Sequence, residues 1–454
     1  MNLWSASITV SLHPITNYVG LLNFGFPVKI MTFGIIKAWI QGVVLIVLSV
    51  AFALGVAEIG LRLFYPKFEL AAGAQFKTDS LRINSRLPNT RRTVHHPDNG
   101  NPHLVIYNNH GMRQHRDFLE SDLDEAVNVG FFGDSYTENA RLPDPYSFTE
   151  PLDYLLNLSG RNFNALNFGQ DGYGTGQSYI AYQYSELAKH LDHIYYVFCI
   201  NDIRNIYEND LFYLDDEGLL QRNPALESPW WIKLISRLHV TYLLQDGYNR
   251  LNPGKNAWEG FDARILQEKH ADKYVRERIR TDRAKSVGRD ILGHKENDDV
   301  KRSLAVFQAI LRDWKELATA NGASFSIVLL PTGRGSVIKG YISDDIPVVD
   351  LYELFADRIP GYKYGDWDFE NDRHWAEAAN SLAASFLYRD IVGKTELSSI
   401  SEHGIDTELY TYYSAFDYGW MPDRPDSYHS PNHAVLEEIL MRYVPLEIGG
   451  NFDR

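Results

Sequence analysis

The longest uninterrupted apolar stretch of the chain lies near its N-terminus, where twenty residues from Ala38 to Ala57 pass without a charge between Lys37 and Glu58. A helix of about 20 apolar residues matches the hydrocarbon core of a bilayer. A buried core helix rarely stays apolar on every face for so long, and the apolar part of a cleaved signal peptide is usually about 7 to 15 residues long. The pattern therefore predicts one transmembrane helix at 38–57, preceded by an N-terminal segment at 1–37.

The charges beside this helix do not set its orientation, because two lysines on its N-terminal side are nearly balanced by Arg62 and Lys67 on the other. Residues 1–28 carry no charged side chain, and Met31 begins a more typical anchor. One hypothesis is therefore that the native chain starts at Met31. Retention of Met1 in N-terminal sequencing of the native protein would reject it.

Beyond the apolar helix, residues 58–126 are polar and rich in turn-forming residues, which predicts a loop-rich approach to the main domain. From Val127 the sequence pattern changes: short apolar runs that end in Gly, Asp or Asn alternate with helical stretches. Five of these runs have the length and composition of buried strands, and they span 127–132, 163–168, 194–200, 324–330 and 347–351.

Between the third and fourth runs, apolar residues recur with the period of one helix face over 300–317, and Gly322 follows as a stop. Strands that alternate with helices predict a doubly wound α/β three-layer sandwich around a mainly parallel sheet of about five strands. In such sheets, ligands bind at the carboxyl ends of the strands. We expect this domain to span 127–392, with a mostly helical insertion at 211–297 beside the substrate cleft and a C-terminal extension at 393–454.

Length, charge and cysteine content limit the classes of function that fit. With 454 residues the chain is too long for one compact core, so one enzymatic domain with insertions, or two domains, are expected. The formal net charge is -15 and no long Lys/Arg block is present, which argues against a nucleic-acid partner. Cys199 is the single cysteine, so we expect neither an intrachain disulfide nor a cysteine-based zinc site, and its apolar neighbours predict that it is buried. No motif such as H-E-x-x-H indicates a metal, and we expect no cofactor.

The first predicted strand ends in the sequence FFGDSYTE, which places Ser135 at the turn into a helix that we expect to begin near Pro145. A serine there stands at the carboxyl edge of the sheet, where backbone N–H groups at a helix start are free to face a developing anion. The same residues also fit an ordinary turn with a capping serine.

The second and third predicted strands end in groups that can donate to an oxyanion. The second runs into NFGQDGYGTGQ, whose glycines allow close backbone approach to a ligand, and we select Gly172 as the amide donor. This cluster lacks the G-x-G-x-x-G spacing and the lysine of nucleotide-binding loops. The third runs into CIND, which places the side-chain amide of Asn201 at the same edge, although an asparagine that closes a turn fits as well.

Two histidines compete for the role of base. The sequence FENDRHW places Asp372 two residues before His374, just ahead of a helix with one apolar face, and a carboxylate so close can orient an imidazole ring. The sequence DSYHSPNH near the C-terminus offers Asp426 and His429 at a D-x-x-H spacing, but it follows a Pro-rich stretch outside the rhythm of strands. We rank His374 first because it follows the fifth predicted strand.

These four sites resemble the SGNH/GDSL hydrolase family, whose four blocks supply Ser, Gly, Asn and His in this chain order, over about residues 127–392. The resemblance implies that Ser135 attacks an ester carbonyl and that Asp372 orients His374, the base. It also implies an oxyanion hole formed by the amide of Ser135 together with Gly172 and Asn201.

The chain departs from the family pattern in two blocks. Cys199 stands where the third block, G-x-N-D, usually has glycine. Asn371 occupies the aspartate position of the usual D-x-x-H, so that Asp372 gives D-x-H-W instead. This shorter spacing resembles the membrane-associated branch that includes alginate O-acetyltransferases.

Three functions follow from these observations as hypotheses. The first is a membrane-anchored serine esterase that removes acyl groups, O-acetyl among them, from small-molecule or cell-surface carbohydrate esters, with its domain on the non-cytoplasmic side of the membrane. The second is an O-acyltransferase that uses the same triad to acylate a polysaccharide. The third is an inactive, anchored binding protein whose working surface is formed by 211–297 and 393–454.

Overall fold

The fold is known from a computed structural model, which describes residues 33–64, 68–69, 76–78, 84–86, 88–98, 100–114, 116–223, 238–251, 283–331, 335–359, 361–363, 365, 367–395 and 400–416. The chain divides into two units, 1–57 and 58–454. We describe each unit by itself.

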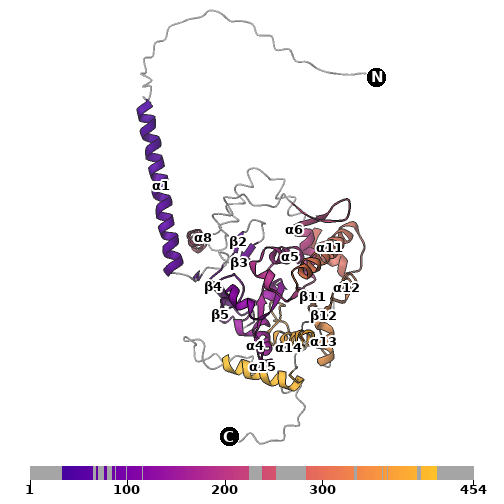
Figure 1. Cartoon of the computed structure of the whole chain (residues 1–454). Coiled ribbons are helices and arrows are strands. Elements are labelled where there is room, and N and C mark those ends of the chain that lie inside the picture. Colours follow the sequence, from indigo (N-terminus) through magenta and orange to yellow (C-terminus); the bar gives the residue numbers. More distant parts are fainter. Residues whose placement is uncertain are drawn as a thin grey trace, which may run out of the picture. The chain divides into compact units, whose positions relative to one another are not determined.

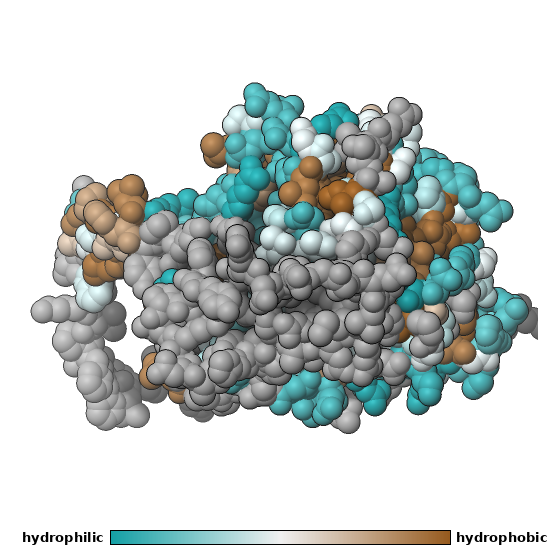
Figure 2. Space-filling view, turned by 90° about the horizontal axis from the view of Figure 1, so that it is seen from below, coloured by the Kyte–Doolittle hydropathy of each residue, from teal (hydrophilic) through white to brown (hydrophobic). Residues whose placement is uncertain are grey.

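Helix α1 (Phe33–Phe64) contains the predicted apolar stretch and extends it at both ends. From Ala38 to Phe64 it is long and apolar enough to cross a membrane. Its large apolar side chains are exposed along most of this length, from Trp39 to Phe64, and they appear as the brown group at the left of Figure 2. The predicted helix at 38–57 is therefore present, and it has the exposed apolar surface that a lipid environment requires.

The five predicted strands all form, and they make one parallel sheet in the second unit. In chain order they are β6 (Val127–Gly133), β7 (Phe163–Asn167), β8 (His193–Phe198), β11 (Ser324–Leu329) and β12 (Val348–Asp350). Their order across the sheet is β12-β11-β8-β6-β7, and every neighbouring pair is parallel. Their residues are buried almost throughout, as expected of strands that are covered on both faces.

This order fixes where a ligand can bind. The chain moves from β6 outward to β7, then returns past β6 to β8 and continues the other way to β11 and β12. Adjacent loops therefore leave in opposite directions at the carboxyl ends of β6 and β8, which opens a crevice between them. Ser135 begins the helix that follows β6, and Asn201 begins the helix that follows β8, so both predicted residues lie at this switch point.

Helices cover both faces of the sheet, which confirms the predicted three-layer α/β sandwich (Figure 1). One face carries α5 (Thr175–Tyr184), α6 (Asn201–Asn209) and α11 (Asp298–Ala320). The fully buried Trp314 of α11 packs there against Phe132, Tyr196 and Phe325 of three strands. The other face carries α4 (Thr149–Asn157), α13 (Leu351–Arg358) and α14 (Glu377–Lys394), and α15 (Glu402–Phe416) packs against α4 and α14.

Residues 58–126 contain more regular structure than the predicted loop-rich segment. Strands β1 (Phe68–Glu69), β4 (Thr90–His95) and β5 (Pro102–Tyr107) form a three-stranded sheet, and β2 (Phe76–Thr78) pairs with β3 (Asn84–Arg86). A short helix, α2 (Glu120–Asp124), precedes β6. The prediction failed here because β4 is charged and β5 buries His103 beside Val105, so neither strand shows a clean alternation of apolar and polar residues.

The predicted insertion at 211–297 begins with a hairpin, which the sequence analysis did not expect. Its strands are β9 (Phe212–Leu214) and β10 (Leu220–Arg222), and Gly218 in the turn has a φ of +76°. Helix α8 (His239–Leu251) and a helical stretch at 283–292 agree with the expected helical character. Residues 224–237 and 252–282 lie outside the described residues.

Candidate active site

Ser135 is the first residue of α3 (Ser135–Glu138), a one-turn helix that starts directly after β6. A helical element does begin near Pro145, as predicted: the 3₁₀ turn η1 (Asp144–Tyr146), which is followed by α4 from Thr149. The prediction missed the separate helix α3, which begins at Ser135 itself. Helix α3 begins at Ser135 because the Asp134 side chain caps it, accepting a hydrogen bond from the Tyr136 amide at 2.9 Å. A Cβ at Gly133 would lie 2.2 Å from Oγ1 of Thr137, so only glycine lets the strand turn this tightly.

Ser135, His374 and Asp372 form a continuous chain of hydrogen bonds. The Oγ of Ser135 lies 2.7 Å from Nε2 of His374, and Nδ1 of the same ring lies 2.6 Å from Oδ1 of Asp372. An ionised carboxylate can only accept, so Nδ1 carries the proton and Nε2 is left to accept from the serine hydroxyl. The structure therefore brings together the predicted nucleophile and the first-ranked base, from positions 239 residues apart in the chain.

Arg141 holds the far oxygen of Asp372, with its Nε 3.0 Å from Oδ2. Partial burial disfavours ionisation of Asp372, but the charges of Arg141 and His374 outweigh it and lower the pKa of this carboxyl below its ordinary value. Asp372 is thus ionised at neutral pH and fixed at both oxygens. Arg141 was not among the predicted residues.

The loop that carries His374 is fixed at several points. Between Asp372 and His374, Arg373 adopts a left-handed backbone conformation with a φ of +57°, which is costly for a residue with a side chain. Its carbonyl accepts a hydrogen bond from the hydroxyl of Tyr136 at 2.7 Å, and the Tyr136 ring packs on that of His374 with a centroid distance of 4.6 Å. The Asp98 carboxylate accepts from the amide of Asn371 at 3.0 Å. These contacts hold the strained backbone in the conformation that aims the imidazole at Ser135.

Asn201, the first residue of α6, lies within hydrogen-bonding distance of the residue before Ser135. Its Nδ2 donates to Oδ2 of Asp134 at 3.1 Å, and burial raises the pKa of that carboxyl. An amide nitrogen has two N–H bonds, so this contact orients the group and leaves one donor available. The preceding Cys199 is buried, as predicted, and its amide donates to the Asp202 side chain at 3.1 Å.

Gly172 lies in the loop after β7, where its φ of +81° is readily adopted only by glycine. Backbone and side-chain bonds connect this loop to α3. The Gln170 amide donates to the Gly133 carbonyl at 3.1 Å, and the Asp171 amide donates to Oε2 of Glu138 at 2.5 Å. The serine loop and the predicted oxyanion loop are therefore joined through Glu138.

Glu138 is fully buried and is paired with residues from the two small sheets that precede the main domain. Arg86 donates to both of its oxygens, at 2.8 and 2.9 Å, and Tyr107 donates to one of them at 2.5 Å. Burial opposes its ionisation, yet the charges of Arg86 and Arg92 lower the pKa of Glu138 to about 2. Sequence reasoning missed this residue, since nothing near it in the chain identifies partners 31 and 52 residues away.

The competing pair, Asp426 and His429, lies outside the described residues. Within the part of the chain that the structure describes, no group of three or more His, Cys, Asp or Glu side chains is placed to hold a metal ion.

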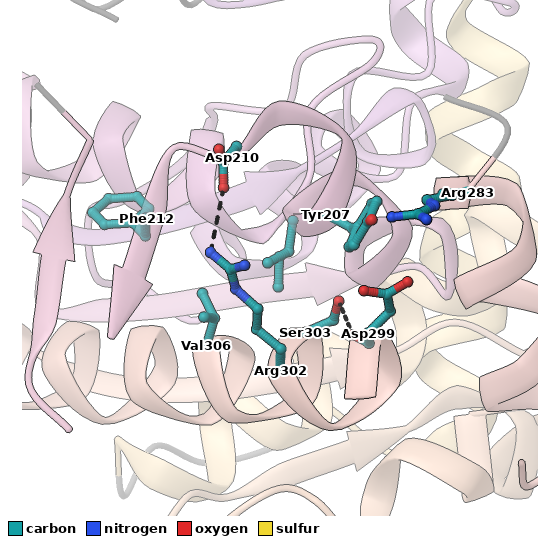
Figure 3. Close-up of a pocket in the computed structure, with 9 residues that line it drawn as sticks. Tyr207, Asp210, Phe212, Arg283, Asp299, Arg302, Ser303 and Val306 are labelled. Atoms are coloured by element: carbon teal, nitrogen blue, oxygen red, sulfur yellow. Dashed lines mark hydrogen bonds and ion pairs between the residues drawn. The ribbon is translucent and has the colours of Figure 1, made fainter. Parts of the chain in front are cut away.

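Among the cavities lined by described residues, two that border α6 bear on the site. One, of about 570 Å³, is lined by Asn201 and adjoins the site. The other, of about 320 Å³, lies between α6 and α11 and includes none of the predicted site residues (Figure 3). In it Arg302 points toward Asp210, 4.0 Å away, and Oγ of Ser303 donates to the Asp299 carbonyl at 2.8 Å.

The chain matches no protein-family model and no curated protein. Similar solved structures include a lipolytic protein of the G-D-S-L family from Desulfitobacterium hafniense DCB-2, which is 13% identical over 58% of this chain and 98% of its own, with a TM-score of 0.30. The acetylxylan esterase Axe2 from Geobacillus stearothermophilus is 13% identical over 59% of this chain and 95% of its own, with a TM-score of 0.31. A two-domain esterase active on acetylated mannans is 10% identical over 62% of this chain and 54% of its own, with a TM-score of 0.29. At such low scores, any functional argument rests on the geometry of the site.

Proposed function

We propose that this protein is a membrane-anchored serine esterase of the SGNH/GDSL type that hydrolyses acyl esters. One observation carries the proposal: a hydroxyl, an imidazole and an ionised carboxylate are linked by bonds of 2.7 and 2.6 Å at the switch point of a parallel sheet. An ordinary capping serine needs neither an imidazole at its Oγ nor a carboxylate behind that imidazole. This arrangement is the one that turns a serine into a nucleophile.

In the proposed reaction, Nε2 of His374 accepts the proton of Ser135 as Oγ attacks the ester carbonyl carbon. The carbonyl oxygen becomes an oxyanion, which collapses with loss of the alcohol, and the alcohol leaves with the proton that His374 returns. Water then attacks the acyl-enzyme by the same steps, releasing the acid and restoring Ser135. Base assistance of this kind contributes about 10²- to 10⁴-fold to the rate.

The oxyanion is proposed to be held by the amides of Ser135 and Gly172 and by the side chain of Asn201. The position of Ser135 at the N-terminal end of α3 supports this role, because backbone amides at the start of a helix have no partner within the helix. Asn201 supports it because Asp134 fixes the orientation of its amide group. Each donor of this kind is worth on the order of 10²- to 10³-fold in turnover.

The apolar helix α1 supports anchoring through one membrane span, and the family resemblance favours placement of the domain on the non-cytoplasmic side. The same resemblance favours O-acetyl esters of cell-surface carbohydrate as substrates. Transfer of the acyl group to a polysaccharide hydroxyl would use the same acyl-enzyme, so product analysis with acceptor present decides between hydrolysis and transfer.

The direct test is covalent labelling of the full-length protein with a fluorophosphonate, which reacts with activated serines. We expect labelling of the wild type, none of Ser135→Ala, and full labelling of the control Ser343→Ala, which removes an exposed serine from another loop. Parallel His374→Ala and His429→Ala variants test the choice of base, and only the first should lose turnover. A folded wild-type protein that is not labelled would overturn the esterase proposal and favour an anchored binding protein.

A further inference from the structure

The cavity of about 570 Å³ that Asn201 borders has an unusual concentration of positive charge. Its polar lining, apart from Asn201, consists of Arg204, Lys285 and Arg289. Ile200, Gly288 and Leu292 complete its described lining, and no acidic residue is among them. The protein as a whole carries a formal net charge of -15, so the positive charge of this lining is opposite in sign to the net charge of the chain.

The three cations come from two elements and converge on one space. Arg204 lies three residues after Asn201 on α6, which places the two side chains on the same side of that helix. Lys285 and Arg289 are four residues apart on the helical stretch 283–292, and they also share a face. The backbone of Gly288 lies against α6, with its Cβ position 3.6 Å from Cβ of Arg204. The close approach of the two elements at this glycine places the three positive groups beside one cavity.

Among the described residues, two of these three cations have no acidic partner. Arg204 forms an ion pair with Glu208, whose Oε2 lies 3.7 Å from its Nε, although this Nε makes no hydrogen bond among the described residues. In the part of the chain that the structure describes, neither Lys285 nor Arg289 forms an ion pair of 4.0 Å or less. By contrast, Lys295 and Arg302 elsewhere in the same region do reach aspartates. Like charges that face one cavity repel one another, and an anion placed among them relieves that repulsion.

We propose that this cavity selects ester substrates that also carry a negatively charged group, a carboxylate or a phosphate, close to the ester. The inference rests on the proposed function for the chemistry, because Asn201 is the group that connects the cavity to the ester carbonyl. Arginine and lysine side chains donate charge-assisted hydrogen bonds to both kinds of anion. The apolar side chains of Ile200 and Leu292 offer a surface for the uncharged part of the same substrate.

The test compares three aryl acetates on the full-length protein: methyl 4-acetoxybenzoate, which is neutral, 4-acetoxybenzoate and 4-acetoxyphenyl phosphate. Each kcat/KM is divided by the rate of hydroxide hydrolysis of the same ester, which removes differences in intrinsic reactivity. We expect the wild type to prefer an anionic ester by about 10- to 100-fold, the range that charge-assisted hydrogen bonds provide. The better of the two anions identifies the group as carboxylate or phosphate.

The decisive variant is the double substitution Lys285→Gln with Arg289→Gln, which leaves Ser135, His374 and Asn201 intact. Its preference should fall at least tenfold while the neutral ester is hydrolysed as before. The matched control, Arg161→Gln with Lys189→Gln, makes the same change of charge just before β7 and β8, at the opposite edge of the sheet. Its preference should stay at the wild-type value.

Three results would overturn the inference: no anionic preference in the wild type, a preference retained in the cavity variant, or an equal loss in the control. These results differ from those expected if the proposed esterase function is wrong. In that case none of the three acetates is hydrolysed and the fluorophosphonate does not label Ser135. In that case, equilibrium binding of 4-hydroxybenzoate and 4-hydroxyphenyl phosphate decides the role of the cavity without any chemistry. Binding that is lost in the cavity variant supports the anion site, and absence of binding to the wild type rejects it.

Discussion

Replacing Asp372 in two ways should give two different losses, in an order that the structure sets. In Asp372→Ala, Nδ1 of His374 loses the carboxylate at 2.6 Å but keeps the backbone carbonyl of residue 372, which is 3.2 Å away. The ring therefore retains the tautomer that can accept the serine proton. What is lost is one charge-assisted hydrogen bond, so we expect kcat to fall by about 10- to 100-fold.

Asp372→Asn should be worse although it is the smaller change. Arg141 donates to Oδ2, so the asparagine side chain must turn its oxygen toward Arg141 and its NH₂ group toward Nδ1 of His374. Because the asparagine NH₂ group donates to Nδ1 of His374, Nδ1 must be unprotonated and the ring proton lies on Nε2. Nε2 can then no longer accept the hydroxyl proton of Ser135. A wrong tautomer of this kind costs on the order of 10⁴-fold in kcat.

The assay is kcat and KM for hydrolysis of 4-nitrophenyl acetate, together with the rate of fluorophosphonate labelling. Asp216→Asn, in the exposed turn of the β9–β10 hairpin, is the control and should match the wild type. KM should change little in any variant, because Asp372 contacts the base rather than the substrate. Equal losses in Asp372→Ala and Asp372→Asn, or wild-type rates in both, would refute the proposed geometry.

Three further predictions follow from the same contacts. Asn201→Ala should lower kcat about 10²- to 10³-fold with little change in KM, and unchanged turnover would remove Asn201 from the site. Arg141→Gln alone should lower kcat about tenfold. When Arg141→Gln is combined with Asp372→Ala or with Asp372→Asn, the two double variants should have similar rates, because Arg141 no longer fixes the orientation of the asparagine amide; unequal rates would contradict this. The pKa of the Glu138 carboxyl is lowered from 4.5 to about 2 in the folded protein, so its ionisation stabilises the fold above pH 4.5 by roughly 3 kcal/mol. This stabilisation is lost as the pH falls toward 2. Chemical denaturation should therefore show that Glu138→Gln is less stable at pH 7 and loses less stability on acidification, and parallel curves would reject the assignment.

The central sheet was predictable because its strands are buried on both faces and read as short apolar runs. The five predicted runs match the five strands to within two residues at each end. The strands before Val127 were not predictable in this way, because β4 reads TRRTVH and its charged residues hide the alternation. The pattern of apolar and polar residues reveals a strand when each face of the strand has one kind of neighbour. Strands β4 and β5 instead contact both an apolar cluster and polar partners.

The residues of the proposed reaction could be identified because each lies in a short, recognisable sequence within a few residues of the end of a strand or the start of a helix. Their supporting residues could not be identified in this way. Arg141 reaches Asp372 across 231 residues, and Tyr136 reaches the carbonyl of Arg373 across 237. Neither contact leaves a local pattern, since any polar residue with a suitable reach would serve. The start of α3 at Ser135 was also missed, because the cap is made by the acidic residue immediately before it.

The buried carboxylate of Glu138 determines how short a working version of this protein can be. A chain that begins at Val127 would contain every residue proposed for the reaction, yet it would lack Arg86 and Tyr107. Leaving a buried charge without its partners costs about 3 to 5 kcal/mol, a large share of the stability of a typical domain. The smallest unit that folds with an ordered serine loop therefore begins upstream of the sheet, at or before β3.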